Sequence, residues 1–137
     1  MNLYIDCEWN GFEGDLISMA LVAENGKEWY EELGCENPVD WVAENVMPHL
    51  TKKAVDKSQM QNSLAQFLLS LNTPVNIVAD WPEDIERFCA LLITGPGERI
   101  ETPPLSMQIV RIEAESVIPH NALEDARGIR RALTTTA

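Results

Sequence analysis

Near its N-terminus the chain reads Leu3-Tyr4-Ile5-Asp6-Cys7-Glu8-Trp9. Apolar and polar side chains alternate along this stretch, which is the period of a β-strand. The alternation places Asp6 and Glu8 on one face of the predicted strand and Trp9 on the opposite, apolar face. Carboxylates two residues apart on a strand are separated by about 7 Å at the backbone, which lets both reach one hard cation.

The position of this strand bears on the meaning of its two carboxylates. Taken alone, they also fit a strand face that is open to solvent. Residues 16–23, however, form a long apolar run that is typical of a buried strand. We expect the first strand to lie beside this run in the centre of a sheet, where two neighbouring bare charges on one face are rare. We therefore interpret Asp6 and Glu8 as a candidate metal-binding pair.

The rest of the chain predicts a mixed sheet flanked by helices. An Asn25-Gly26 turn joins residues 16–23 to a returning strand at 28–33, and Asp40 is expected to cap the first helix. Further on we predict helices at 40–50, 58–71, 80–92 and 122–133, strands at 75–79 and 105–112, and an exposed loop at 94–104. A hairpin meander followed by alternating helices and strands predicts an α/β fold with a mixed central sheet of about five strands.

Length and composition limit the classes of protein that fit. A chain of 137 residues with 45% apolar and 23% charged side chains is expected to form one domain over residues 1–137. No apolar run approaches the roughly 20 residues that cross a bilayer, and the N-terminus lacks the pattern of a signal peptide. We therefore expect a cytoplasmic protein without membrane contact. Three cysteines without CxxC spacing favour free thiols over a disulfide framework or a zinc site.

The charge of the chain argues against an extended nucleic-acid interface. The chain has 22 acidic and 10 basic residues, a net charge of −12, and such a surface repels phosphate. Arg127, Arg130 and Arg131 nevertheless follow one another at helical spacing after the last acidic residue, Asp125. These arginines either meet an incoming phosphate backbone or complement the C-terminal dipole of the last helix. An anionic ligand would need such a local basic face or a bound cation.

A second group of acids begins the predicted helix at 80–92. Asp80 and Glu83 have the spacing of a capping box, and Pro82 fits the first turn because its missing N–H has no helical partner there. Asp84 lies in the same turn, just beyond the end of a strand. Capping and the helix dipole explain Asp80 and Glu83 well, whereas Asp84 remains a candidate site residue.

A third group lies at the start of the last helix. Asn121 and Glu124 repeat the capping spacing, and Asp125 follows four residues after the cap. His120 lies in the loop immediately before. A single histidine at this position more often serves packing or capping than catalysis, but here a carboxylate lies five positions on, at the same helix mouth.

Together these residues form a chemically consistent set: Asp6, Glu8, Asp84, Asp125 and His120. Clustered carboxylates raise one another's pKa unless a divalent cation neutralises them. A ligand set made only of oxygen suits Mg²⁺ or Mn²⁺ and not zinc. Two such ions about 4 Å apart stabilise the attacking and leaving oxygens of a phosphoryl displacement. A neutral histidine beside them can take the proton of the attacking water.

With these residues the chain resembles the DEDDh 3′-to-5′ exonucleases, which share the ribonuclease H-like fold. The three motifs of that family are matched by Asp6-x-Glu8, by Asp84 in a strand-to-helix turn, and by His120-x-Ala122-x-x-Asp125. The resemblance spans residue 3 to about residue 133. The chain is most similar to the small 3′-5′ exoribonuclease-like proteins of bacteria and phage, in which Trp or Phe follows the first Glu.

The second motif departs from the family pattern. The family usually carries His-Asn-x-x-Phe-Asp there, whereas this chain has Asp80 in place of the Asn and Glu83 in place of the aromatic residue. We identify Asp84 as the carboxylate of this motif because its spacing from the cap matches, and Asp80 is the alternative.

The resemblance implies a role for each site residue. Asp6 would bridge two divalent cations, Mg²⁺ or Mn²⁺, while Glu8 and Asp125 complete the shell of the first. Asp84 would hold the second ion, and His120 would be the general base of a reaction that releases 5′-mononucleotides. The implied partners are the 3′ ends of single-stranded nucleic acid, with RNA favoured over DNA.

Two further expectations concern substrate contact and assembly. Trp9 is a candidate for stacking on the terminal base, a contact worth on the order of 1–3 kcal/mol, although core packing explains it as well. Members of the family often form homodimers, so the helix around Trp41 and Val46 is a candidate contact surface. The alternatives to an exoribonuclease are a DNA 3′-5′ exonuclease of the proofreading type and a non-catalytic acidic interaction protein that retains the fold.

Overall fold

The computed structural model describes residues 1–112 and 118–134. Its strands are β1 (Asn2–Trp9), β2 (Leu16–Ala23), β3 (Glu28–Glu32), β4 (Val75–Ala79), β5 (Ile93–Gly95), β6 (Glu98–Arg99) and β7 (Leu105–Ile109). Its helices are α1 (Asp40–Asn45), α2 (Lys57–Ser70), α3 (Pro82–Leu92) and α4 (Ala122–Thr134), with a short 3-10 helix, η1, at Met47–His49. The single domain predicted over residues 1–137 includes stretches 113–117 and 135–137, which lie outside the described residues.

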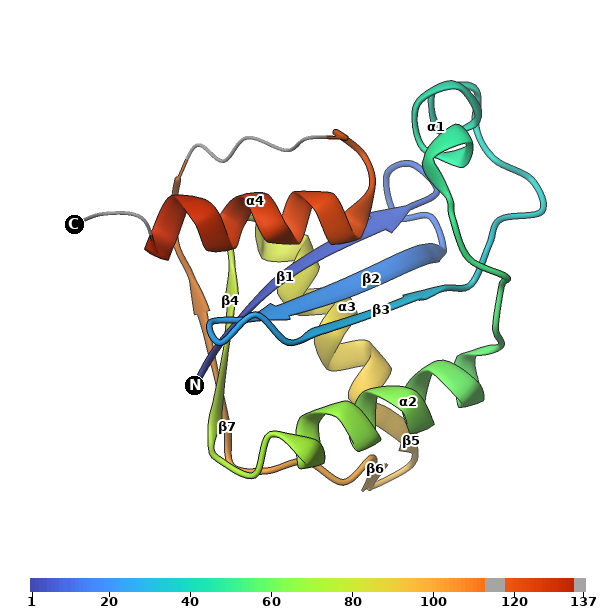
Figure 1. The fold of residues 1–137 in the computed structure, drawn as a ribbon. Helices are drawn as coiled ribbons and strands as arrows, with labels where there is room; N and C mark the ends of the chain where they lie inside the picture. The colour runs from blue at the N-terminus through green and yellow to red at the C-terminus, as the bar shows by residue number, and fades with distance from the viewer. Residues whose placement is uncertain (113–117, 135–137) are drawn as a thin grey trace.

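Five of the strands form one mixed sheet in the order β3-β2-β1-β4-β7 (Figure 1). The β1–β2 and β2–β3 pairs are antiparallel, whereas β4 runs parallel to both β1 and β7. The Asn25-Gly26 turn joins β2 to β3 as expected, and Gly26 adopts a φ of 91° that suits glycine. The predicted α/β class, the mixed sheet and the central position of β1 are therefore confirmed.

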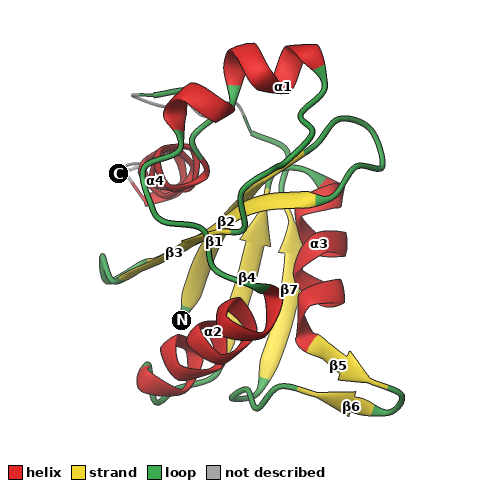
Figure 2. Cartoon of the chain, turned by 90° about the vertical axis from the view of Figure 1, so that its right-hand side faces the viewer, coloured by secondary structure: helices red, strands yellow, loops and turns green. Residues whose placement is uncertain are grey.

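The helices cover both faces of this sheet (Figure 2). α2 and α3 pack on one face, where Leu64 and Phe88 join Leu3 and Ile5 of β1 in the main core. α4 packs on the other face over a cluster in which Ala20 of β2 meets Ala122 and Ala126 of the helix. Because these side chains are small, the start of α4 lies close to the sheet, on the face that carries the carboxylates of β1.

The structure corrects three expectations about the elements. Residues 94–104, predicted to be a loop, contain part of the β5–β6 hairpin, which turns at Gly97 with a φ of 67°. The glycines and proline that indicated a loop there form the turn of a hairpin instead. The strand predicted at 105–112 ends at Ile109, and the helix predicted at 40–50 is broken into α1 and η1 around Pro48.

Two predicted helix caps are also wrong. The N-cap of α1 is Val39 and that of α3 is Trp81, and neither makes a side-chain capping hydrogen bond. Asp40 is instead the first residue of α1, and Asp80 precedes the cap of α3. Pro82 at the first position of α3 explains this start, since a proline there loses no helical hydrogen bond.

The surface predicted around Trp41 and Val46 is also different from expectation. Val46 is fully buried with Val42 and Ile17, so it contributes nothing to a contact surface. Trp41 is 53% exposed.

Candidate metal centre

The candidate site lies where β1 continues past the end of β4. The two strands pair only through residues 2–4 of β1, and β4 ends at Ala79. The second half of β1 therefore has no strand neighbour on that side. Asp6 lies in this open half of β1, where residues that follow β4 can approach it. Ends of parallel strands are a common location for ligand sites in α/β sheets.

The first turn of α3 fills the gap beside β1. The Asp84 carboxylate accepts a hydrogen bond from the backbone amide of Cys7, with Cys7 N to Asp84 Oδ1 at 3.1 Å. This bond replaces a missing sheet partner, and it fixes an almost fully buried carboxylate next to β1. Asp80 leaves the end of β4 on the same side and also approaches Asp6.

The start of α4 supplies the third part of the site. Asn121 caps the helix as predicted, because its Oδ1 accepts the backbone amide of Glu124 at 3.0 Å. Its amide nitrogen donates to the carbonyl of His49 at 2.8 Å, which ties the helix start to η1. Asp125 follows Glu124 in α4, and its Oδ2 accepts a hydrogen bond from the backbone amide of His120 at 3.2 Å.

These elements bring the carboxylates together in two groups that share one residue. Asp6, Glu8 and Asp125 form the first group, and Asp6, Asp80 and Asp84 form the second. Within each group, one carboxylate oxygen from each residue lies within 4.8 Å of those from the other two. All four predicted acids are thus assembled, and Asp80 joins Asp84 instead of replacing it.

The electrostatics of this cluster favour a bound cation. Burial, followed by repulsion from Asp84, Glu8 and Asp125, raises the pKa of Asp6 well above its usual range. Burial and a hydrogen-bonded Asp125 raise the pKa of Glu8 to about 8. Burial and Asp80 raise the pKa of Asp84 to about 8. Without a cation these groups would hold protons near neutral pH, and a divalent cation would replace those protons.

Two observations test whether the residues fit divalent cations. The Oδ2 atom of Asp6 is buried and has no hydrogen-bond partner among the described residues, although it is a strong acceptor. The donor set consists only of carboxylate oxygens, which suits Mg²⁺ or Mn²⁺. A cation shared by the two groups would satisfy the unpartnered oxygen, so the residues fit the ions that the sequence predicts.

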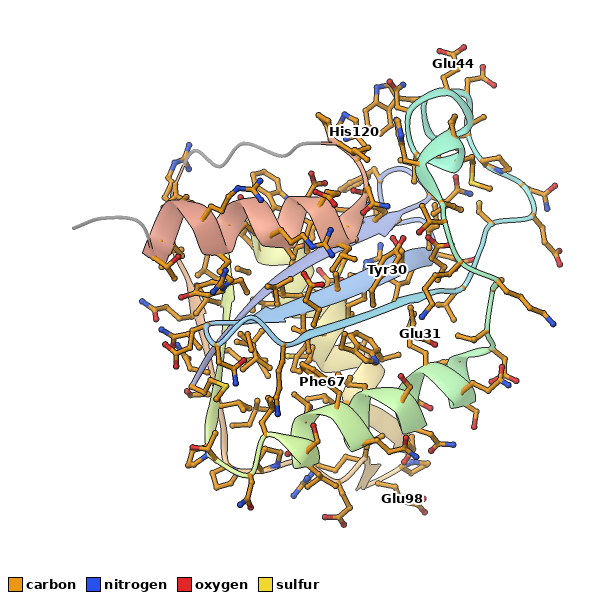
Figure 3. The ribbon with its side chains drawn as sticks, viewed as in Figure 1. Tyr30, Glu31, Glu44, Phe67, Glu98 and His120 are labelled. Atoms are coloured by element: carbon orange, nitrogen blue, oxygen red, sulfur yellow. The ribbon has the colours of Figure 1, made fainter. Side chains whose placement is uncertain are left out.

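His120 lies at the mouth of the site but outside both carboxylate groups. Figure 3 shows it at the start of α4, on the side of α1. Its ring packs edge-on against Trp41, with ring centroids 4.9 Å apart. His120 adopts a φ of 67°, an uncommon conformation for a residue with a side chain. The turn and the bond from its amide to Asp125 fix the backbone of His120 relative to the site.

An aromatic groove of about 500 Å³ adjoins the carboxylates. Glu8 lines it together with four aromatic side chains: Trp9, Phe12, Trp41 and Trp81. Phe12 is 85% exposed, and Trp81 is 53% exposed, so the groove presents large apolar surfaces to solvent. Trp9 lines the groove as the stacking prediction requires, and it also packs against the main core as the alternative requires.

The sequence singles out Asp80 only as a helix cap and as the alternative to Asp84, and Pro82 is the signal that α3 starts later. It does not single out Phe12 or Trp81. Phe12 and Trp81 lie in a loop and at a helix start, and no periodic pattern connects them with Trp9. Their meeting depends on the path of the chain between strands.

The arginines of α4 are engaged in the structure. Arg127 forms ion pairs with Glu28 of β3 and with Glu124, and Arg130 donates to the carbonyl of Glu24 at 3.0 Å. The predicted contact of Arg127 with an incoming backbone would need this network to open. These side chains instead attach α4 to the β2–β3 hairpin.

No protein-family model matches the chain, and no curated protein matches its sequence. Among the helices of the described residues, none combines the length and apolarity needed to cross a bilayer.

Proposed function

We propose that this protein is a metal-dependent 3′-5′ exonuclease of the DEDDh type, with a ribonuclease H-like fold. Its substrate would be the 3′ end of a single strand, RNA in preference to DNA, and its product a 5′-mononucleotide. The observation that carries this proposal is the sharing of Asp6 between two groups of carboxylates. A shared carboxylate between two oxygen-only sites is the arrangement that two-metal phosphoryl transfer requires.

Each acidic residue of the cluster would have its own role in holding the ions. Asp6 would bridge both ions, Glu8 and Asp125 would complete the first site, and Asp80 and Asp84 would complete the second. When bound, two such ions lower the pKa of an attacking water and offset the negative charge of the phosphodiester.

His120 and the aromatic groove would complete the active site. One ring nitrogen of His120 would accept the proton of the attacking water, while Trp41 limits how the ring turns. The groove beside Glu8 would hold unpaired bases, because Trp9 and the exposed rings of Phe12 and Trp81 offer flat apolar surfaces. The groove therefore supports a single-stranded substrate.

The test is cleavage of matched RNA and DNA strands with a 3′ overhang, in Mg²⁺, Mn²⁺ or EDTA. We expect shortening from the 3′ end only with metal, and faster on RNA. Asp6→Asn should abolish cleavage, and His120→Ala should lower kcat by about 10²- to 10⁴-fold, the usual contribution of a general base. Glu44→Gln, an exposed charge change on the outer side of α1, is the matched control and should leave kcat unchanged (Figure 3).

Each contrary outcome of the cleavage assay would contradict a different part of the proposal. Cleavage that survives EDTA, or that survives both substitutions, would contradict the metal-dependent mechanism. No cleavage under any metal would favour the acidic interaction protein instead. Equal or faster cleavage of DNA would keep the mechanism and reverse the substrate preference.

A further inference from the structure

A second pocket, of about 260 Å³, includes Arg87, whose guanidinium lies over the ring of Trp9. It is lined by Leu16 at the start of β2, Leu33 after β3, Lys57 at the start of α2, and Arg87 and Leu91 of α3. Neither the carboxylate groups nor the aromatic groove includes Lys57 or Arg87.

The pocket gathers two of the ten basic residues of an acidic chain. In residues 1–112 and 118–134, the ion pairs engage Lys52 and Arg127, whereas Lys57 and Arg87 have no carboxylate partner. The Nε atom of Arg87 is buried and lacks a hydrogen-bond acceptor among those residues. Guanidinium groups bind phosphate well, and a buried donor without a partner is costly. An anion in the pocket would give these two cations a partner of opposite charge.

Trp9 connects this pocket to the carboxylates. The guanidinium of Arg87 lies over the Trp9 ring, with its central carbon 5.4 Å from the ring centroid. Trp9 also lines the aromatic groove beside Glu8. This cation–π contact holds Arg87 beside Trp9, which lines the groove. A strand that ends at the carboxylates and crosses Trp9 would reach Arg87.

The remaining lining of the pocket matches a nucleotide better than a bare phosphate. Leu16, Leu33 and Leu91 offer an apolar wall that suits the face of a base, while the two cations suit its phosphate. Asp15 is the one acid in this lining, and its exposed carboxylate would repel the same phosphate.

We propose that the pocket of Lys57 and Arg87 holds a nucleotide upstream of the 3′ end of a single-stranded substrate. This inference rests on the proposed function, since it assigns the second point of contact for the same strand. The subsite would provide local electrostatic attraction for the phosphate backbone in a protein whose net charge is −12. It would also make affinity depend on strand length, because a short product cannot occupy both places.

The experiment measures the affinity of RNA strands of increasing length by calorimetry. The strands carry a phosphorothioate at the 3′-terminal linkage, and Ca²⁺ replaces Mg²⁺ so that binding is seen without cleavage. For the wild type we expect affinity to rise sharply at the length that first reaches the pocket. Lys57→Gln and Arg87→Gln should each reduce this rise in affinity about five- to tenfold, and each should leave the affinity of the mononucleotide unchanged. Asp15→Asn should increase the step.

Lys53→Gln is the matched control, since it removes an exposed charge four residues from Lys57 without lining the pocket. It should weaken all lengths equally. A length step that is unchanged in Lys57→Gln and Arg87→Gln would overturn this subsite and leave the proposed function standing. If the wild type binds no strand, both fall. Should Arg87→Gln lower the unfolding temperature sharply, the exposed Lys57 decides alone.

Discussion

Asp6 is the residue on which both groups of carboxylates depend. Burial makes its ionised form costly, and neighbouring acids on β1, α3 and α4 raise that cost further. A side chain chosen for stability alone would be neutral at this position. A bound cation would offset this cost, so we attribute the charge of Asp6 to metal binding and not to the stability of the fold.

Neutralising Asp6 should therefore stabilise the protein when metal is absent. In EDTA we expect Asp6→Asn to raise Tm by a few degrees, since about 1 kcal/mol moves the Tm of a domain of this size by roughly 3–6 °C. Added Mn²⁺ should raise the Tm of the wild type but not of the variant. Differential scanning calorimetry measures both effects. Glu44→Gln, which removes an exposed charge, is the control, and a lower Tm for Asp6→Asn in EDTA would refute the argument.

The same residues predict how stability changes with pH. Glu8 has an ordinary pKa of 4.5 in the unfolded chain and one of about 8 in the folded protein, and Asp84 also reaches about 8 when folded. The folded state therefore holds protons that the unfolded chain has released, so the free energy of unfolding should fall as pH rises from about 5 to about 8 in EDTA.

Urea titrations across this pH range measure the effect. Saturating Mg²⁺ should flatten the profile, because the ion replaces the protons. The double variant Glu8→Gln, Asp84→Asn should make it shallower without metal, and the buried Asp6 accounts for the pH dependence that remains. A free energy of unfolding that stays level or rises for the wild type in EDTA would count against the raised pKa values.

At the scale of elements, the start of α4 is held by a single residue with two bonds. Asn121 accepts from Glu124 to cap the helix and donates to His49 to fix η1 beside it. The same turn positions both His120 and Asp125. Capping and the geometry of the site are therefore coupled through one side chain.

Replacing Asn121 should consequently affect stability and activity differently. Asn121→Ala should cost about 1 kcal/mol or more of unfolding free energy, from loss of the cap, and should lower kcat. Asn121→Asp keeps the capping acceptor and loses the donor to His49, so it should recover most of the stability but less of the activity. Chemical denaturation and the cleavage assay separate these effects. Equal recovery of both by Asn121→Asp would show that the bond to η1 is unimportant.

The elements also show how far the sequence determines the site. Strand periodicity placed Asp6 and Glu8 correctly on one face, because the face of a strand follows directly from residue number. A local capping signal placed Asn121 correctly for the same reason. The capping-box spacing of Asp80 and Glu83 predicts the wrong cap for α3. Pro82 is a second start signal, and it places the cap at Trp81. The approach of Trp81 and Phe12 was beyond local patterns, since it depends on where β4 ends relative to β1.

For the whole molecule, the net charge of −12 determines how a nucleic acid can bind. Repulsion acts over the entire surface, whereas attraction would come from the bound cations and from a few side chains such as Lys57 and Arg87. Arg127 does not add to this attraction while its ion pairs with Glu28 and Glu124 persist. Binding should therefore be local, dependent on divalent ions and confined to one end of a strand.

The dependence of affinity on NaCl should change sign with the divalent ion. In EDTA, salt screens the repulsion between the strand and the acidic surface, so raising NaCl from 50 to 200 mM should leave weak binding unchanged or strengthen it. In Ca²⁺, two phosphates neutralised by Lys57 and Arg87 would give a slope of log affinity against log salt no steeper than about −1.4, because each contact on a single strand contributes about −0.7. Lys57→Gln should reduce the slope by about half, and Lys53→Gln should not. Calorimetric titrations of one RNA strand at several salt concentrations measure these slopes. A slope as steep as that of a protein with many phosphate contacts would mean that a broad basic surface exists, which contradicts local binding at the carboxylates.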